Sequence, residues 1–255
     1  MAKLRLSLLV LVAAGLVCGC MSNRGSGLLT NDANPAAYHF QMGLSFLGER
    51  NYTNALIELT EAVQLDPDNP EVLYNLGLAY LGKRRPDLSV KQFQRAIELK
   101  PNYSAARNDL GVAFIELKRW DQAIEQFRIV KDDIFYANTE NAAINLGLAY
   151  LGKGDFSKAM DELAIVASSN PSNPIAKVAM GRVLFAMGKT EQALAEFQRA
   201  LRLYKEYGAA HFYLGMAQLK LNRQEEARQA FKETIRILPD SELARQAAGY
   251  LELMK

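Results

Sequence analysis

The sequence predicts an all-α solenoid made of six copies of a helix pair, followed by one further helix. A Leu-Gly or Met-Gly pair recurs six times at a constant spacing, except for one slightly longer interval between the third and fourth pairs. A fixed step after each glycine comes alanine or serine, and then leucine or phenylalanine, as Ala55 and Leu59 follow Gly43. Apolar residues fall at helical intervals around these positions. The recurring pairs are Met42-Gly43, Leu76-Gly77, Leu110-Gly111, Leu146-Gly147, Met180-Gly181 and Leu214-Gly215.

The N-terminus is typical of an exported protein. Lys3 and Arg5 precede an apolar run over residues 6–17. This run is too short for a membrane-spanning helix, which needs about 20 residues, but it fits the core of a signal peptide. We therefore assign residues 1–19 to a signal peptide.

The signal peptide ends in Val17-Cys18-Gly19-Cys20, which resembles the bacterial lipobox. The resemblance implies cleavage before Cys20 and covalent lipid on that cysteine; no other cofactor is expected. Met21 follows where an aspartate would retain a lipoprotein at the inner membrane, so the resemblance implies the outer membrane, facing the periplasm. The alternative is an ordinary signal peptide with an incidental cysteine.

Residues 20–35 are rich in Gly, Ser and Asn and are interpreted as a flexible tether. A chain of this length has a root-mean-square reach of roughly 20 Å. A folded domain could therefore sample the periplasm close to the membrane.

Six units of the array fill residues 36–241, and residues 242–255 continue a helical pattern as a capping helix. Proline closes four units, whereas Lys205 stands at that place in the fifth. The third unit lacks the proline and precedes a two-residue insertion within residues 131–140. We expect an altered junction there, which could act as a hinge. The units are 36–69, 70–103, 104–137, 140–173, 174–207 and 208–241.

Glycine inside a helix costs about 1 kcal/mol relative to alanine. Six glycines at one helical position therefore indicate a compensating gain, and we expect close helix–helix approach. His39, His211 and Trp120 occupy positions that favour packing roles. Residues 83–85 are interpreted as a solvated turn.

The pattern resembles the tetratricopeptide repeat over residues 36–241. The resemblance implies a right-handed superhelix whose concave wall comes from the first helix of each unit. A groove lined by these helices would bind an apolar protein segment, although the leucines could instead pack between units. Asn108 and Asn145 could hydrogen-bond a peptide backbone or be solvated. The predicted groove residues are Phe40, Leu44, Leu47, Tyr74, Leu78, Leu81, Asn108 and Val112.

Composition disfavours other classes of function. The chain has 30 basic and 28 acidic residues; loss of Lys3 and Arg5 with the signal peptide leaves a neutral protein. Phosphate binding needs a basic excess, so nucleic acid is not expected as a partner. Two histidines and two cysteines supply a metal site or a Cys–His pair poorly. No catalytic residue, metal or small-molecule substrate is predicted, and the protein is not expected to be an enzyme.

The lipobox, tether, six repeats and cap together resemble the pilotins of type IV pilus biogenesis, the PilF/PilW/Tgl family. The stretch from Asp133 to Tyr136, followed by Asn145-Leu146-Gly147-Leu148, adds to that resemblance. It implies a non-enzymatic protein that binds secretin subunits and promotes their outer-membrane localisation and multimer assembly. The alternative is a general periplasmic scaffold for cell-wall or polysaccharide-export machinery.

Overall fold

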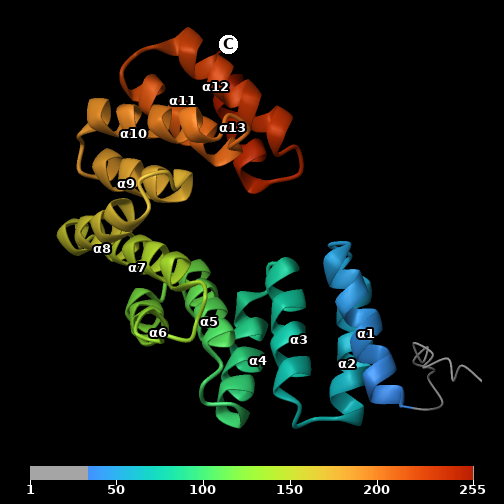
Figure 1. Cartoon of the computed structure of the whole chain (residues 1–255). Coiled ribbons are helices and arrows are strands. Elements are labelled where there is room, and N and C mark those ends of the chain that lie inside the picture. Colours follow the sequence, from blue (N-terminus) through green and yellow to red (C-terminus); the bar gives the residue numbers. More distant parts are fainter. Residues whose placement is uncertain (1–33, 255) are drawn as a thin grey trace, which may run out of the picture.

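The computed structural model describes residues 34–254, in which thirteen α-helices and no strand are present (Figure 1). The predicted signal peptide, Cys20 and the tether as far as residue 33 lie outside the described residues. The helices are α1 (Pro35–Gly48), α2 (Tyr52–Leu65), α3 (Pro70–Gly82), α4 (Pro86–Leu99), α5 (Ser104–Glu116), α6 (Trp120–Lys131), α7 (Thr139–Lys153), α8 (Phe156–Ser169), α9 (Pro174–Ala186), α10 (Thr190–Leu203), α11 (Gly208–Lys220), α12 (Gln224–Ile237) and α13 (Glu242–Leu253).

The predicted all-α solenoid is confirmed. Each odd-numbered helix from α1 to α11 packs against the helix that follows it, and α13 packs on α12 at the C-terminal end. The first helix begins at Pro35, which we had placed in the tether. Asn34 caps this helix, since its Oδ1 accepts a hydrogen bond of 3.1 Å from the backbone N–H of Ala37. Proline at the first helical position needs no hydrogen-bond partner for its nitrogen.

The recurring glycines let the two helices of each unit approach closely. A Cβ atom on Gly77 would lie only 2.5 Å from Cε1 of Phe93, whose side chain is completely buried. The same relation recurs in every unit, so the compensating gain expected from the sequence is confirmed as tight packing. The other pairs are Gly43–Leu59, Gly111–Phe127, Gly147–Leu163, Gly181–Phe197 and Gly215–Phe231.

A second glycine contact joins neighbouring units. The ring of Trp120, at the start of α6, packs over Gly152 near the end of α7, where a Cβ atom would lie 2.5 Å from the ring. Tyr52 packs in the same way over Gly82. The packing role predicted for Trp120 is therefore confirmed, and its place is the interface between two units.

The turn inside each unit contains one residue with a left-handed backbone. Glycine occupies this position in two units, at Gly154 and Gly188, and a residue with a side chain occupies it in four. Left-handed backbone is strained for residues that carry a Cβ atom. The four are Arg50, Arg84, Lys118 and Asn222, with φ between 57° and 59°.

The links between units are alike except for the one at the predicted junction. Residues 132–138 connect α6 to α7, whereas the other links span 66–69, 100–103, 170–173, 204–207 and 238–241. The link that carries Lys205 in place of proline has the same length as its neighbours. The altered junction is thus confined to the insertion after α6.

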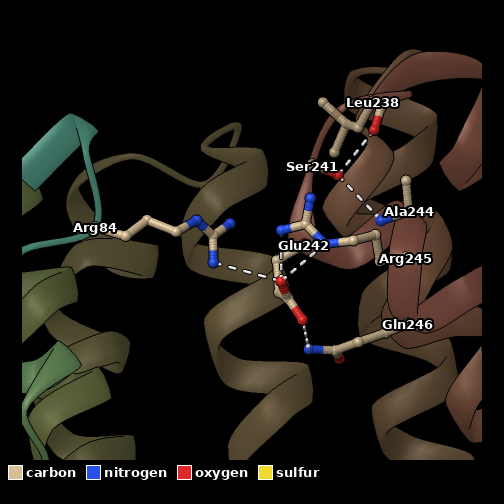
Figure 2. A network of polar contacts seen from close by, with 7 residues as sticks. All are labelled: Arg84, Leu238, Ser241, Glu242, Ala244, Arg245 and Gln246. Atoms are coloured by element: carbon tan, nitrogen blue, oxygen red, sulfur yellow. Dashed lines mark hydrogen bonds and ion pairs between the residues drawn. The ribbon is translucent and has the colours of Figure 1, made fainter. Parts of the chain in front are cut away.

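The array curves, with the first helices on its inner wall. Over the described residues, the backbones of successive first helices approach one another from α1 to α11, whereas the backbones of successive second helices lie further apart. The curvature turns the C-terminal helices back towards the side of the second unit (Figure 1). Arg84, in the turn between α3 and α4, has Nη1 3.4 Å from Oε2 of Glu242, the first residue of α13 (Figure 2). The residues 83–85 interpreted as a solvated turn therefore include a contact with the far end of the array.

Candidate protein-binding surface

The eight predicted groove residues lie on α1, α3 and α5, on the inner wall of the curve. All eight are half-buried, so each both packs against neighbours and leaves part of its side chain accessible. Their half-burial is compatible with both interpretations weighed from the sequence, and binding at these positions stays a prediction.

Phe40 shows both roles. Its ring packs, with Leu47, against the buried core between the first two units. It also lines a pocket of about 170 Å³ between the N-terminal ends of α1 and α3, together with Ala37, Asn69 and Val72. An apolar side chain of a partner entering this pocket would bury surface at about 25 cal/mol per Å².

Tyr74, predicted to line the groove, is fixed by contacts within the protein. Its ring centroid lies 5.0 Å from that of Tyr103 and 5.9 Å from that of Phe93. Its hydroxyl donates a hydrogen bond of 2.8 Å to Oδ2 of Asp109. Burial and the nearby Asp109 carboxylate both raise the pKa of Tyr74, so the phenol stays protonated.

Asp109 is the centre of a polar network across three first helices. Its Oδ1 accepts a hydrogen bond of 3.0 Å from Nδ2 of Asn108, and Nδ2 of Asn145 lies 3.3 Å from Oδ1 of Asn108. Burial raises the pKa of Asp109, although the hydrogen bonds from Tyr74 and Asn108 oppose this. Asn108 and Asn145, considered as ligands for a peptide backbone, are thus bonded within the protein.

A pocket lined by charged residues, here called the charged gap, lies between the turn after α3 and the start of α13. This pocket of about 600 Å³ is lined by Leu81, Gly82, Arg84, Pro86, Glu116 and Glu242. Burial raises the pKa of Glu116, against the opposing charge of Arg84. Of the predicted groove residues, Leu81 is the one that borders this gap.

Both histidines predicted to pack also have polar partners. Nδ1 of His39 lies 2.8 Å from Oε2 of Glu58, and Nε2 of His211 lies 2.9 Å from the carbonyl oxygen of Lys205. Both are half-buried. Their packing assignment was therefore incomplete, because it overlooked these partners.

Residues 34–254 contain neither a candidate metal site nor a candidate membrane-spanning helix. No group of three or more His, Cys, Asp or Glu side chains there is arranged to hold a metal ion. No helix in the same range has the length and apolar character needed to cross a membrane.

The sequence interpretation missed an exposed apolar surface on the outer side of the array. Ile134 and Phe135, at the tip of the altered junction, are 87% and 91% exposed. Ile129 and Ile165, on neighbouring second helices, are also exposed. Comparing the same position across all units would have revealed the two helical isoleucines, because the other units carry charged residues there.

These features define a helical-repeat scaffold that binds other proteins, a class that is generally not enzymatic. The chain belongs to the tetratricopeptide repeat family. Residues 74–137 and 178–242 match the family description "Tetratricopeptide repeat", and residues 50–83 match "TPR repeat".

Curated relatives match part of the array. The chain is 30% identical over 111 residues to Protein CTR9 homolog of Arabidopsis thaliana, which covers 43% of this chain and 10% of that protein. It is 29% identical over 108 residues to DnaJ homolog subfamily C member 3 of Rattus norvegicus, covering 42% and 21%. The matched segment thus spans at most about a fifth of these relatives.

Solved structures share the fold at low identity. PilW, described as a widely conserved type IV pilus biogenesis factor, has a TM-score of 0.68 at 18% identity, covering 84% of this chain and 99% of PilW. PilF of Pseudomonas aeruginosa has 0.61 at 17%, covering 84% and 97%. A tetratricopeptide repeat protein of Parabacteroides merdae has 0.78 at 18%, covering 88% and 86%. At these identities the similarity establishes the fold alone.

Proposed function

We propose that this protein is a lipid-anchored pilotin that binds secretin subunits of the type IV pilus and promotes their assembly at the outer membrane. The observation that carries the proposal is the lipobox ending at Cys20, placed a short tether ahead of a six-unit array. PilW and PilF support it, because this chain covers nearly the whole of each at a similar fold. No bond is made or broken in this function.

The inner wall of the first three units supplies the binding surface in this proposal. Phe40, Leu44 and Leu47 on α1, with Leu78 on α3, are half-buried apolar side chains. An apolar segment of the secretin would cover their accessible parts. Tyr74 and Asn108 would contribute rigidity, since their polar groups are bonded within the protein.

The lipid on Cys20 would supply the second part of the mechanism. It would confine the complex to the periplasmic face of the outer membrane, which raises the local concentration of secretin protomers and favours multimers. Two or three acyl chains anchor stably, whereas one binds only marginally.

A general periplasmic scaffold for cell-wall or polysaccharide-export machinery is the second candidate. The same tether and repeat array would serve such a scaffold with a different bound protein. The cargo, not the fold, separates the two candidates.

The test is the assembly state of the secretin in outer-membrane fractions of strains with the gene intact, deleted, or carrying Cys20→Ala. The proposal predicts loss of multimers on deletion, with monomers persisting. In the Cys20→Ala strain, multimers should be fewer or displaced from the outer membrane. Normal multimers in all three strains would overturn the pilotin proposal and leave the scaffold.

A further inference from the structure

One outward-facing position of the second helices differs between units. It lies two residues after the buried phenylalanine or leucine, and it is charged in four units: Glu61, Arg95, Arg199 and Glu233. In the third and fourth units it is isoleucine, and Ile129 and Ile165 are 45% and 59% exposed. The apolar exception is therefore confined to the two units that flank the altered junction.

The junction adds two larger apolar side chains, held in an ordered turn. Oδ1 of Asp133 accepts a hydrogen bond of 3.0 Å from the backbone N–H of Phe135, and the carbonyl oxygen of Asp133 accepts one of 3.1 Å from the N–H of Tyr136. The hydroxyl of Ser104 donates to the other carboxylate oxygen of Asp133. Asp133 thus anchors the turn that presents Ile134 and Phe135 to solvent.

We infer that these exposed residues form one surface, which we call the junction patch: Ile129, Ile134, Phe135 and Ile165. Ile129 and Phe135 line the same pocket of about 390 Å³, with Pro101 among its other residues. An ion pair between Lys131 Nζ and Glu162 Oε2, 2.9 Å long, ties the end of α6 to α8. Ile165 lies one turn after Glu162, on the same side of α8.

The border of the junction patch is acidic and unpaired. Glu125 and Asp161 lie one turn before the two helical isoleucines, and Asp132 follows α6; all three are exposed. Within residues 34–254 none of these carboxylates forms an ion pair, and none accepts a side-chain hydrogen bond. The nearby cations have other partners. Lys131 pairs with Glu162 and Lys158 with Asp155. Arg107, which lines the pocket, donates hydrogen bonds to Gln126 and to the carbonyl oxygen of Pro101, and Arg128 donates one to the hydroxyl of Tyr150.

We propose that the junction patch is a second protein-docking surface, which binds a segment of another protein whose large apolar residues are flanked by Lys and Arg. Exposed apolar groups that gather in one place mark interaction sites, and the unpaired carboxylates select basic neighbours. They also repel an anionic membrane. The surface lies on second helices and a link, whereas the proposed secretin groove lies on first helices, so the two sites are separate.

The experiment uses two short synthetic peptides that form amphipathic helices with the same leucine stripe. One carries Lys and Arg beside the stripe and the other carries Glu. Their affinities for residues 20–255 with Cys20→Ala are measured by fluorescence anisotropy at two salt concentrations. The basic peptide is expected to bind, more weakly at the higher salt, and the acidic one to bind at least tenfold more weakly.

Variants assign the binding to the patch. Ile134→Ser with Phe135→Ser is expected to lower the affinity for the basic peptide at least tenfold. Ile57→Ser, at another exposed isoleucine, is expected to leave that affinity unchanged. The triple variant Glu125→Gln, Asp132→Asn and Asp161→Asn is expected to lower the affinity for the basic peptide and to make that affinity less dependent on salt concentration. Unchanged circular dichroism and melting temperature would show that each variant folds.

Several outcomes would overturn the proposal. One is equal affinity of the wild-type protein for the two peptides, and another is the absence of detectable binding of the basic peptide. A third is undiminished binding of the basic peptide by Ile134→Ser with Phe135→Ser. Loss of binding in Phe40→Glu with Leu44→Glu, but not in the patch variant, would place the peptide in the groove. If the protein forms a dimer in sedimentation and the patch variant does not, the patch binds a second copy of the chain. If the protein pellets with anionic vesicles and the patch variant does not, the patch binds a membrane. None of these outcomes bears on secretin assembly.

Discussion

The hydroxyl of Tyr74 donates a hydrogen bond of 2.8 Å to the carboxylate of Asp109, one unit further along the array. This bond joins α3 to α5 on the inner wall, and Asn108 and Asn145 extend the network to α7. Part of the wall that the sequence assigned to partner binding therefore holds consecutive units together.

Tyr74→Phe should destabilise the array. The substitution keeps the ring but removes one donor from a buried carboxylate, which costs about 1–3 kcal/mol. Urea unfolding followed by circular dichroism measures the change. Tyr204→Phe is the matched control, because Tyr204 is 52% exposed, and it should change stability by less than about 0.5 kcal/mol. Equal effects of the two substitutions would contradict a structural role for the Tyr74 hydroxyl.

The network should also make stability depend on pH. Burial raises the pKa of Asp109 in the folded state above its unfolded value of about 3.9. The unfolded chain then releases its proton first, so this carboxyl lowers stability as pH rises through that window. Unfolding free energies from pH 3 to 7 should show the wild type losing stability relative to Asp109→Asn as pH rises from about 4. A difference independent of pH would contradict the raised pKa.

Gly77→Ala should destabilise the protein although alanine favours helices. The added Cβ atom would lie 2.5 Å from the Phe93 ring, and overpacking typically costs about 1–3 kcal/mol. Gly249→Ala, inside α13 with no atom within 4 Å of the added Cβ, should instead stabilise by up to about 1 kcal/mol. Thermal melting of both variants measures the contrast. The same sign at both positions would refute the close-packing explanation.

Lys118→Gly should stabilise the array. Lys118 has φ of 57°, in the left-handed region that two other units fill with glycine. Relief of that strain is worth about 1 kcal/mol. Gly154→Ala, where φ is 87°, should have the opposite effect of similar size. Denaturant midpoints of the two variants check both signs.

The fold was predictable because the repeat period is visible along the chain. Each unit repeats the contact between its glycine and the buried Phe or Leu, so one unit explains the next. The groove positions came from the resemblance to the tetratricopeptide family, and all eight are half-buried residues of α1, α3 and α5.

What the sequence did not reveal depends on geometry between units. The bond from Tyr74 to Asp109 crosses one period plus one residue, an offset set by the packing of α3 on α5. The contact of Arg84 with Glu242 depends on the accumulated rotation of several units (Figure 2). Ile134 and Phe135 lie in the altered junction at the end of the third unit, where the period gives no information about exposure.

The central claim is tested most directly by the affinity between this protein and the purified periplasmic domains of the secretin from the same organism. The protein used is residues 20–255 with Cys20→Ala, alone and with Phe40→Glu plus Leu44→Glu. We predict at least tenfold weaker binding for the double variant at unchanged melting temperature, and no change for Ile57→Glu on the outer side of α2. Undiminished binding by the folded double variant would contradict the inner wall of the first units as the secretin-binding surface.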